Sequence, residues 1–364
     1  MTPSRRDFLA TASAAATATT VVGSLCANPV VPQSNSTKRC LFLHLVGGPS
    51  QLDTFDPKPH ASSDIRGPFG TIPTAIPGVH FSELLPRTAS LMKDVSLIRT
   101  LHHDEAPIHE NGFQLLHTGR RFGDGPAWPG MGAVVNHLRK SDASNPYMNL
   151  LYPGVPINCG ISVDLGQGAA WLGERKPYSP DYSDRPPSFL ENSLMACHHL
   201  MEGGSQFAVV NMYDSVFNST TWDCHAAGGR LNSTLDDYRE SVCPQFDIAF
   251  SATIRMLKQS GQLDETLVVA VGEFGRTPKL NANGGRDHWA GCWSALIAGG
   301  GVQGGRVIGE SDAHAAMPKD RPVTCPELVA TIYHALGIPS STTIRTPDGK
   351  AVRVVDAEPV RELF

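Results

Sequence analysis

The sequence has little that points to nucleic acid. Its 364 residues carry a formal net charge of -5, with 30 Lys and Arg residues against 35 Asp and Glu residues. No segment gathers Lys and Arg into a continuous basic stripe. Because proteins that bind nucleic acid need such clustered positive charge, neither DNA nor RNA is expected as a partner.

The eight cysteines lack the spacing of a structural zinc site. None of them forms a Cys-x-x-Cys pair, which excludes a zinc ribbon. In an oxidising compartment some of them can form disulfide bonds, and Cys224 with Cys243 is the candidate pair. Removal of Cys26 with an N-terminal leader leaves an odd number of cysteines, so at least one thiol is expected to stay free.

Long hydrophobic segments are also missing. The run from Leu9 to about Leu25 is rich in Ala and Thr, and it is too short and too weakly apolar for a bilayer span of about 20 residues. Arg5 and Arg6 precede this run, and such a pair resembles the twin-arginine export signal. A general secretory signal or a short membrane anchor is the alternative. No stable membrane span is expected.

We therefore predict a signal peptide at residues 1–27, read by the Tat translocase, and a periplasmic or extracellular mature protein. Residues 28–38 form a polar linker rich in Pro, Ser and Asn. Residues 39–364 are long enough for a single large α/β domain. A loop-rich segment at about 145–189 is predicted to be an insertion, either a lid or a wall of the substrate site.

Short, wholly apolar strands alternate with amphipathic helices along the mature chain. This alternation predicts a doubly wound α/β fold with a mainly parallel sheet and helices on both faces. The expected strands are Cys40–Val46, Val95–Arg99, Phe207–Met212, Thr266–Val271 and Trp293–Ala298. The expected helices are Glu83–Met92, His109–Leu116, Ser188–Met201, Gln245–Gly261 and Pro326–Leu336.

Acidic and imidazole side chains follow four of these strands. An isolated Asp-x-His is more often a solvated loop or a helix cap, but clusters after several strands converge at one edge of a parallel sheet. Carboxylates and imidazoles together suit one or two divalent metals, with Zn, Mn, Ca or Mg as candidates. The predicted ligands are Asp53, Asp223, His225, Glu273, Asp287 and His288, and Asp56 is the alternative to Asp53.

Three motifs resemble one branch of the alkaline phosphatase and sulfatase superfamily, the exported branch known as domain of unknown function 1501. They are Gly47-Gly48-Pro49-Ser50-Gln51-Leu52-Asp53-Thr54-Phe55-Asp56-Pro57-Lys58, Gly272-Glu273-Phe274-Gly275-Arg276-Thr277-Pro278 and Gly285-Arg286-Asp287-His288-Trp289. The resemblance implies an alkaline phosphatase-like α/β sandwich that holds its metals at the carboxyl edge of the sheet. It also implies that Asp223, His225 and His288 bind the first metal.

The sequence departs from the superfamily pattern at three positions. Gly47 stands where a carboxylate ligand usually ends the first strand. Phe274 replaces the imidazole of an Asp-His pair, and Asp287 could supply the ligand that Phe274 cannot. His109 stands at the nucleophile position, as counted back from Leu116-His117-Thr118-Gly119. His109 could therefore attack the substrate, bind a metal or act as a base.

Arg276 and Arg286 are candidates to hold an anionic ester, because a guanidinium matches two phosphate or sulfate oxygens. The alternative for Arg276 is a pairing with a carboxylate that braces its loop. The leading hypothesis is an exported metal-dependent hydrolase of phosphate or sulfate esters, whose substrate is a small molecule or a polysaccharide. The alternative is a non-catalytic exported protein on the same scaffold that binds a metal, a glycan or a partner.

Overall fold

The computed structural model describes residues 38–123, 127–139, 166–173, 188–203, 205–213 and 215–364. The predicted signal peptide and nearly all of the predicted linker lie outside these ranges, as does most of the predicted insertion at about 145–189. Those three assignments stay predictions. Among the described residues, no helix combines the length and the apolar character that a bilayer crossing requires.

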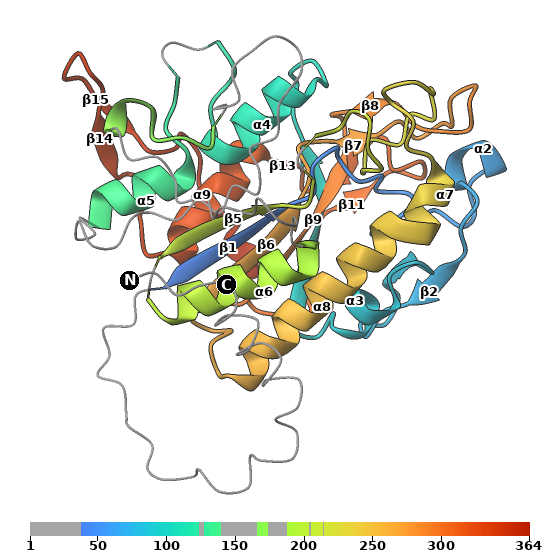
Figure 1. Cartoon of the computed structure of the whole chain (residues 1–364), viewed down its shortest axis with the longest axis horizontal. Helices are drawn as coiled ribbons and strands as arrows, with labels where there is room; N and C mark the ends of the chain where they lie inside the picture. Colours follow the sequence, from blue (N-terminus) through green and yellow to red (C-terminus); the bar gives the residue numbers. More distant parts are fainter. Residues whose placement is uncertain (1–37, 124–126, 140–165, 174–187, 204, 214) are drawn as a thin grey trace, which may run out of the picture. The chain divides into compact units, whose positions relative to one another are not determined.

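A seven-stranded sheet lies at the centre of the described domain (Figure 1). The strand order is β10-β4-β9-β6-β1-β5, and β13 also pairs with β4. β9 runs antiparallel to β4 and β6, whereas the other pairs in this sheet are parallel. The strands are β1 (Arg39–His44), β4 (Val95–His102), β5 (Phe207–Asn211), β6 (Thr266–Val271), β9 (Trp293–Ala298), β10 (Val307–Ile308) and β13 (Val323–Thr324).

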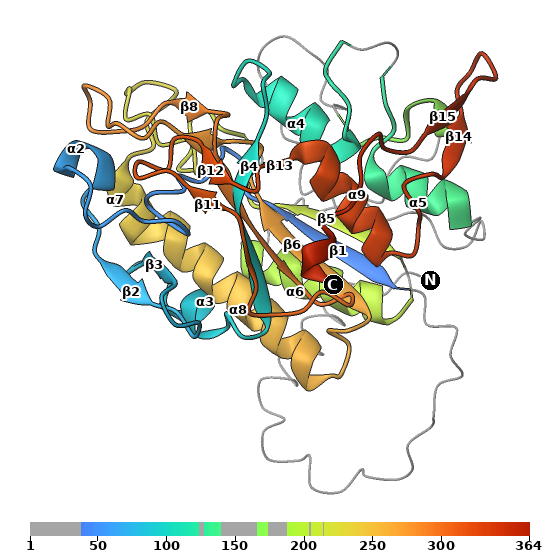
Figure 2. The same cartoon turned by 180° about the vertical axis from the view of Figure 1, so that it is seen from behind.

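Helices cover both faces of the sheet, as Figures 1 and 2 show from opposite sides. Successive strand residues point to opposite faces, so Leu41 and Leu43 join one apolar core while Cys40 and Phe42 join the other. The first core includes side chains of α3 (Pro86–Ser90), α6 (Phe189–Met201) and α8 (Cys243–Gln259). The second includes side chains of α4 (His109–Thr118), α5 (Met131–Arg139) and α9 (Cys325–Ala335). The predicted doubly wound α/β architecture is confirmed.

The predicted bounds of β6 and β9 match the structure residue for residue, because both strands are wholly buried apolar runs. The helix predicted at Glu83–Met92 is shorter than expected and spans only Pro86–Ser90. Pro86 lacks a backbone N–H and suits the first turn of a helix, which places the start there.

The antiparallel direction of β9 matters for the functional edge of the sheet. The chain leaves β1, β5 and β6 at their carboxyl ends, and it enters β9 at that same edge. Before β9, the chain forms a two-stranded ribbon of β7 (Gly275–Arg276) and β8 (His288–Trp289). Residues just before β9 therefore reach the edge where the other strands end.

The remaining short elements lie outside the central sheet. They are α2 (Ser63–Arg66), β2 (Thr71–Pro73), β3 (His80–Ser82), η2 (Ala170–Leu172), α7 (Leu235–Asp237), η3 (Tyr238–Val242), β11 (Glu310–Ser311), β12 (Pro318–Asp320), β14 (Thr343–Arg345), β15 (Ala351–Arg353) and η4 (Arg361–Leu363).

The predicted disulfide between Cys224 and Cys243 is wrong. Both residues are free thiols that are fully buried in the core shared with α8. Burial raises the pKa of both thiols, so each stays protonated and packs as a small apolar side chain. The other cysteines of the described part of the chain are also buried free thiols.

Candidate metal centre

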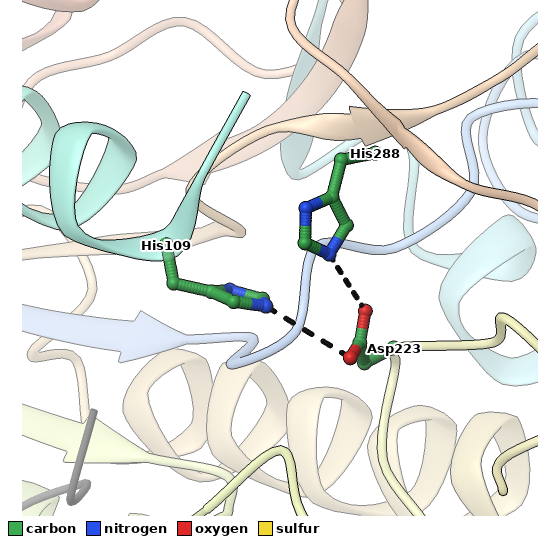
Figure 3. Close-up of side chains that lie close together, drawn as sticks. All are labelled: His109, Asp223 and His288. Atoms are coloured by element: carbon green, nitrogen blue, oxygen red, sulfur yellow. Dashed lines mark hydrogen bonds and ion pairs between the residues drawn. The ribbon is translucent and has the colours of Figure 1, made fainter. Parts of the chain in front are cut away.

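Three predicted site residues converge at the carboxyl edge of the sheet (Figure 3). His109 is the first residue of α4, Asp223 lies in the loop that follows β5, and His288 begins β8. One ligand atom from each of these three residues lies within 4.8 Å of the other two. The structure thus gathers side chains from distant parts of the sequence, of which the nearest two, Asp223 and His288, are 65 positions apart.

The backbone around Asp223 is held by its buried neighbour Trp222. The Trp222 indole donates to Met212 Sδ at 3.1 Å, and its carbonyl accepts from the Tyr238 hydroxyl at 2.7 Å. Gly47 lies directly against Asp223 with φ +106, and a Cβ there would lie 2.7 Å from the Asp223 nitrogen. Glycine at this position is therefore what lets the two loops approach each other.

The two carboxylate oxygens of Asp223 differ in their partners. Oδ1 accepts from Arg276 Nη2, and it lies 3.1 Å from His225 Nε2 and 3.0 Å from His288 Nε2. Oδ2 is buried and has no hydrogen-bond partner within the described part of the chain, while His109 Nε2 lies 3.9 Å from it. A buried carboxylate oxygen without a partner is costly, and a cation beside it would remove that cost.

All three imidazoles around Asp223 are oriented by an acceptor at Nδ1. When Nδ1–H donates to such an acceptor, deprotonation of Nε2 makes that nitrogen available to a metal, as in histidines that bind metals through Nε2. The pairs are His109 with Glu273 Oε1 at 2.6 Å, His225 with Asp287 Oδ1 at 2.9 Å and His288 with the Pro107 carbonyl at 2.8 Å.

The pKa values of His109 and His288 are shifted in opposite directions. Burial disfavours a charged His109, but hydrogen bonds and charges from Asp223 and Glu273 outweigh it and raise the pKa of His109 to about 9. For His288, burial outweighs the Asp223 hydrogen bond and lowers the pKa to about 4. Burial also opposes ionisation of Asp223, yet Arg276 and the imidazoles hold its pKa well below the usual range.

Glu273 lies next to this group but faces His109 from the other side. Its Oε1 accepts from the Gly47 backbone N–H at 2.9 Å and from His109 Nδ1, and its Oε2 lies 3.3 Å from His44 Nε2. The side chain is fully buried. In the structure Glu273 supports His109, and its predicted role as a direct ligand stays a prediction.

Arg276 is fully buried and donates only to protein acceptors. Besides Asp223, its guanidinium donates to the carbonyls of Gly47, Gly48 (2.9 Å) and Arg286 (3.3 Å). These bonds correspond to the bracing alternative that the sequence left open.

Arg286 and Asp53 form a second buried pair. Arg286 Nε donates to Asp53 Oδ2 at 2.6 Å, and Nη2 lies 3.4 Å from Oδ1. Ser50 Oγ also donates to Oδ2 at 2.5 Å. The remaining bonds of Arg286 go to the carbonyls of Thr277, Pro278 and Ile65. The structure does not bring Asp53 into the group around Asp223, so its ligand role stays a prediction.

Two other sequence candidates lie outside the group around Asp223. Asp287 is about half exposed and accepts from Asn281 Nδ2 at 3.1 Å as well as from His225. Asp56, the alternative to Asp53, instead contacts Lys58, Arg99 and Ser311. Asp287 therefore contacts the centre only through an imidazole.

Sequence reasoning missed four buried polar residues behind Glu273. They are His44, His117, Gln167 and Asn211. His44 and Asn211 are the last residues of β1 and β5, each a single polar side chain at the end of an apolar strand. That pattern was the available signal, because a polar residue at such a position needs a buried partner.

Comparison with solved structures identifies relatives of the fold. The lipoteichoic acid synthase LtaP from Listeria monocytogenes is similar over 84% of this chain and 73% of that protein, with 13% identity and a TM-score of 0.50. An inactive form of murine ectonucleotide pyrophosphatase/phosphodiesterase 5 is similar over 84% of this chain and 96% of its own, with 9% identity and a TM-score of 0.51. At such identities the likeness shows the fold alone.

No curated protein matches the sequence significantly. The sequence does match the model of one family, DUF1501, over residues 37–177 and 173–364. This family is described as a protein of unknown function. Together these two segments cover all of residues 39–364, the domain that the sequence predicts. The chain therefore belongs to the DUF1501 family and has the fold of the alkaline phosphatase and sulfatase superfamily.

Proposed function

We propose that this protein is an exported metal-dependent hydrolase of phosphate or sulfate esters. The observation that carries the proposal is the buried, unpartnered Oδ2 of Asp223 amid three imidazoles. The fold supports the proposal, because the similar structures include an ectonucleotide pyrophosphatase/phosphodiesterase and a lipoteichoic acid synthase. The twin-arginine motif supports export.

His109, Asp223 and His288 are the residues that would hold the cation, with His225 beside them. Imidazole nitrogens with one carboxylate favour Zn or Mn over Ca or Mg, which prefer oxygen ligands. A bound divalent cation supplies Lewis acidity toward an ester oxygen. Because His109 Nε2 faces Asp223 Oδ2, we assign His109 to the ligands and not to the nucleophile.

The remaining residues hold these groups in place. Asp287 fixes the ring of His225, and the Pro107 carbonyl fixes that of His288. Arg276 offsets the charge of Asp223 and ties it to the Gly47–Gly48 turn. Arg286 with Asp53 braces the neighbouring loop, so the sequence-based assignment of both arginines to the substrate anion has less support than their bracing role.

The binding of a metal or ligand without catalysis is the second candidate, and a specific observation favours it. The guanidinium groups of Arg276 and Arg286 are fully buried and bonded to protein, so neither presents a free donor to an anion. In this alternative the centre binds a cation but turns over no ester.

Metal content and ester hydrolysis measured on the same preparation separate these candidates. We expect one or more equivalents of Zn or Mn by elemental analysis, together with turnover of a chromogenic phosphate monoester, phosphodiester or sulfate ester. Asp223→Ala and His288→Ala should lose both the metal and the activity. A metal-loaded protein that is inactive on every ester supports the binding of a metal without catalysis. A protein that takes up no divalent metal rejects the metal-dependent hydrolase and leaves the binding of a glycan or a partner.

His314→Ala is the matched control for the loss of one imidazole. His314 is exposed, and its backbone N–H, not its ring, makes the bond to Asp312. This variant should keep the metal content and the turnover of the unchanged protein. An equal loss in His314→Ala would mean that removal of any histidine disturbs the fold.

A further inference from the structure

A polar network leads from the metal centre into the protein behind Glu273. Glu273 Oε2 lies 3.3 Å from His44 Nε2, and His44 Nδ1 lies 3.0 Å from Asn211 Oδ1. None of these three residues is more than 1% exposed. The network therefore joins the carboxyl ends of β6, β1 and β5 without contact to solvent.

The far side of His44 is also enclosed. His117 Nε2 lies 3.3 Å from His44 Nδ1, and Gln167 Nε2 lies 3.0 Å from His117 Nε2. The Phe113 ring packs edge-on against His44, with 4.5 Å between the ring centroids. Because polar and aromatic partners surround the ring, the position of His44 is fixed by its neighbours.

Both carboxylate oxygens of Glu273 face polar groups of this chain. Oε1 receives the Gly47 N–H and faces His109 Nδ1, while Oε2 faces His44 Nε2. The Gly47 N–H and the two imidazoles leave a cation little room beside this carboxylate. The imidazole of His44 thus occupies the place beside Glu273 that a second metal would need.

α4 packs directly against Glu273, which ties the network to the first metal ligand. A Cβ on Gly112 would lie 2.7 Å from the Glu273 carbonyl oxygen, so only glycine permits this approach. His109 lies one turn before Gly112 on the same helix and donates to Glu273. A shift of Glu273 would therefore move or release the His109 ring.

We propose that the centre binds a single divalent cation and that Glu273 and His44 are positioning residues, which orient His109 instead of binding a second metal. This inference rests on the proposed metal site. It adds to that proposal that one cation binds per chain and that Glu273 and His44 hold the ligand His109 in place. Outer partners of a metal-bound histidine typically change metal affinity by about 10- to 100-fold when they are removed.

The test is a zinc titration of the full chain, with bound metal counted by native mass spectrometry and no ester present. We expect one zinc ion per chain in the unchanged protein and in Glu273→Gln and His44→Ala. Both variants should bind zinc about 10- to 100-fold more weakly. His44→Gln places an amide N–H where it can donate to Glu273, and it should recover much of the affinity.

Leu257→Ala is the control for lost stability alone. Leu257 is a fully buried residue of α8 in the core on the opposite side of the sheet from α4. It should destabilise the fold and leave zinc affinity unchanged. The visible spectrum of the cobalt-substituted protein should change in Glu273→Gln and His44→Ala but not in Leu257→Ala, because only the network residues set the orientation of a ligand.

The outcomes separate this inference from the proposed function. Two zinc ions per chain, or unchanged zinc affinity in folded Glu273→Gln and His44→Ala, would overturn the inference and leave the proposed metal site intact. A chain that binds no zinc, cobalt or manganese overturns both. Weaker binding in His44→Ala with recovery in His44→Gln supports a positioning role over a merely structural one.

Discussion

Two buried carboxylate–arginine pairs lie at the same edge of the sheet and do different things. In both Asp223–Arg276 and Asp53–Arg286 the side chains are at most 1% exposed. The oxygens of Asp53 are both engaged, by Arg286 and Ser50, whereas Asp223 keeps one oxygen unpartnered and faces three imidazoles. Burial and charge pairing therefore do not distinguish the two carboxylates. The unpartnered oxygen of Asp223 among imidazole nitrogens does distinguish them, and it is the reason that we propose Asp223 as the ligand.

The largest expected effect is on the free energy of unfolding, when the Asp53–Arg286 pair is broken. Asp53→Ala leaves Arg286 buried without its counter-charge, which should reduce the free energy of unfolding by about 3–5 kcal/mol. Urea denaturation measures this effect, and the exposed Asp264→Ala is the control. Zinc should still raise the stability of the folded Asp53→Ala protein. If zinc binding disappeared as it does in Asp223→Ala, the two pairs would have the same role.

The next largest effect is on zinc affinity, when Asp223 of the Asp223–Arg276 pair is changed. Asp223→Asn keeps the shape of the side chain but removes the charge that attracts a cation. Zinc affinity should fall by about 100-fold or more, since the loss of a direct ligand exceeds that of an outer partner. Isothermal titration calorimetry measures this affinity. Asp53→Asn is the matched variant, and its zinc affinity should change by less than about threefold if Asp53 is only a brace.

A substitution at Gly47 tests the Asp223–Arg276 pair alone, because Gly47 lies against Asp223 and not against Asp53. Gly47→Ala forces a Cβ into a position with φ +106 and a 2.7 Å contact to the Asp223 nitrogen, which should cost about 1–3 kcal/mol of folding stability. Zinc affinity should fall as well, because Asp223 must move. Gly78→Ala is the control, since Gly78 has φ +77 but nothing within 4 Å of a built Cβ. Equal zinc affinity in both variants would contradict the close fit at Gly47.

Counted per pH unit, the smallest effect on zinc binding is its dependence on pH. The pKa of His109 is raised to about 9, so this ring is protonated at pH 7 and must lose a proton to bind a cation. The pKa of His288 is lowered to about 4, so that ring is already neutral. Zinc affinity should rise about tenfold per pH unit between pH 6 and 8, with one proton released per zinc ion. A slope near two, or none, would contradict this assignment.

The same shift predicts the pH dependence of stability without added metal. The pKa of His109 in the folded protein lies above the ordinary value of 6.5. The stabilisation that its charged form contributes is therefore complete below about pH 6.5 and is lost as the pH rises toward 9. Thermal denaturation at pH 6 and pH 9 measures this loss in the unchanged protein. His109→Gln should show a smaller difference between the two pH values.

Local sequence was sufficient for the main elements of the fold. Thr266–Val271 and Trp293–Ala298 are uninterrupted apolar runs, and a buried strand is the structure that such short runs favour. The position of Asp223 after β5 was also predictable, because polar groups at the ends of parallel strands gather at one edge. The free state of Cys224 and Cys243 was not, since sequence spacing says nothing about how two thiols are directed.

By itself, the sequence determined the alternation of buried strands and amphipathic helices, the family, and the kind of side chain at each strand end. These features depend on local periodicity and on residue chemistry. Only the tertiary structure decided that Asp53 meets an arginine, that Asp223 meets imidazoles and that His44 lies beside Glu273. The reason is physical, since a carboxylate takes its role from the donors that surround it, and those come from strands and loops that are far apart in the chain.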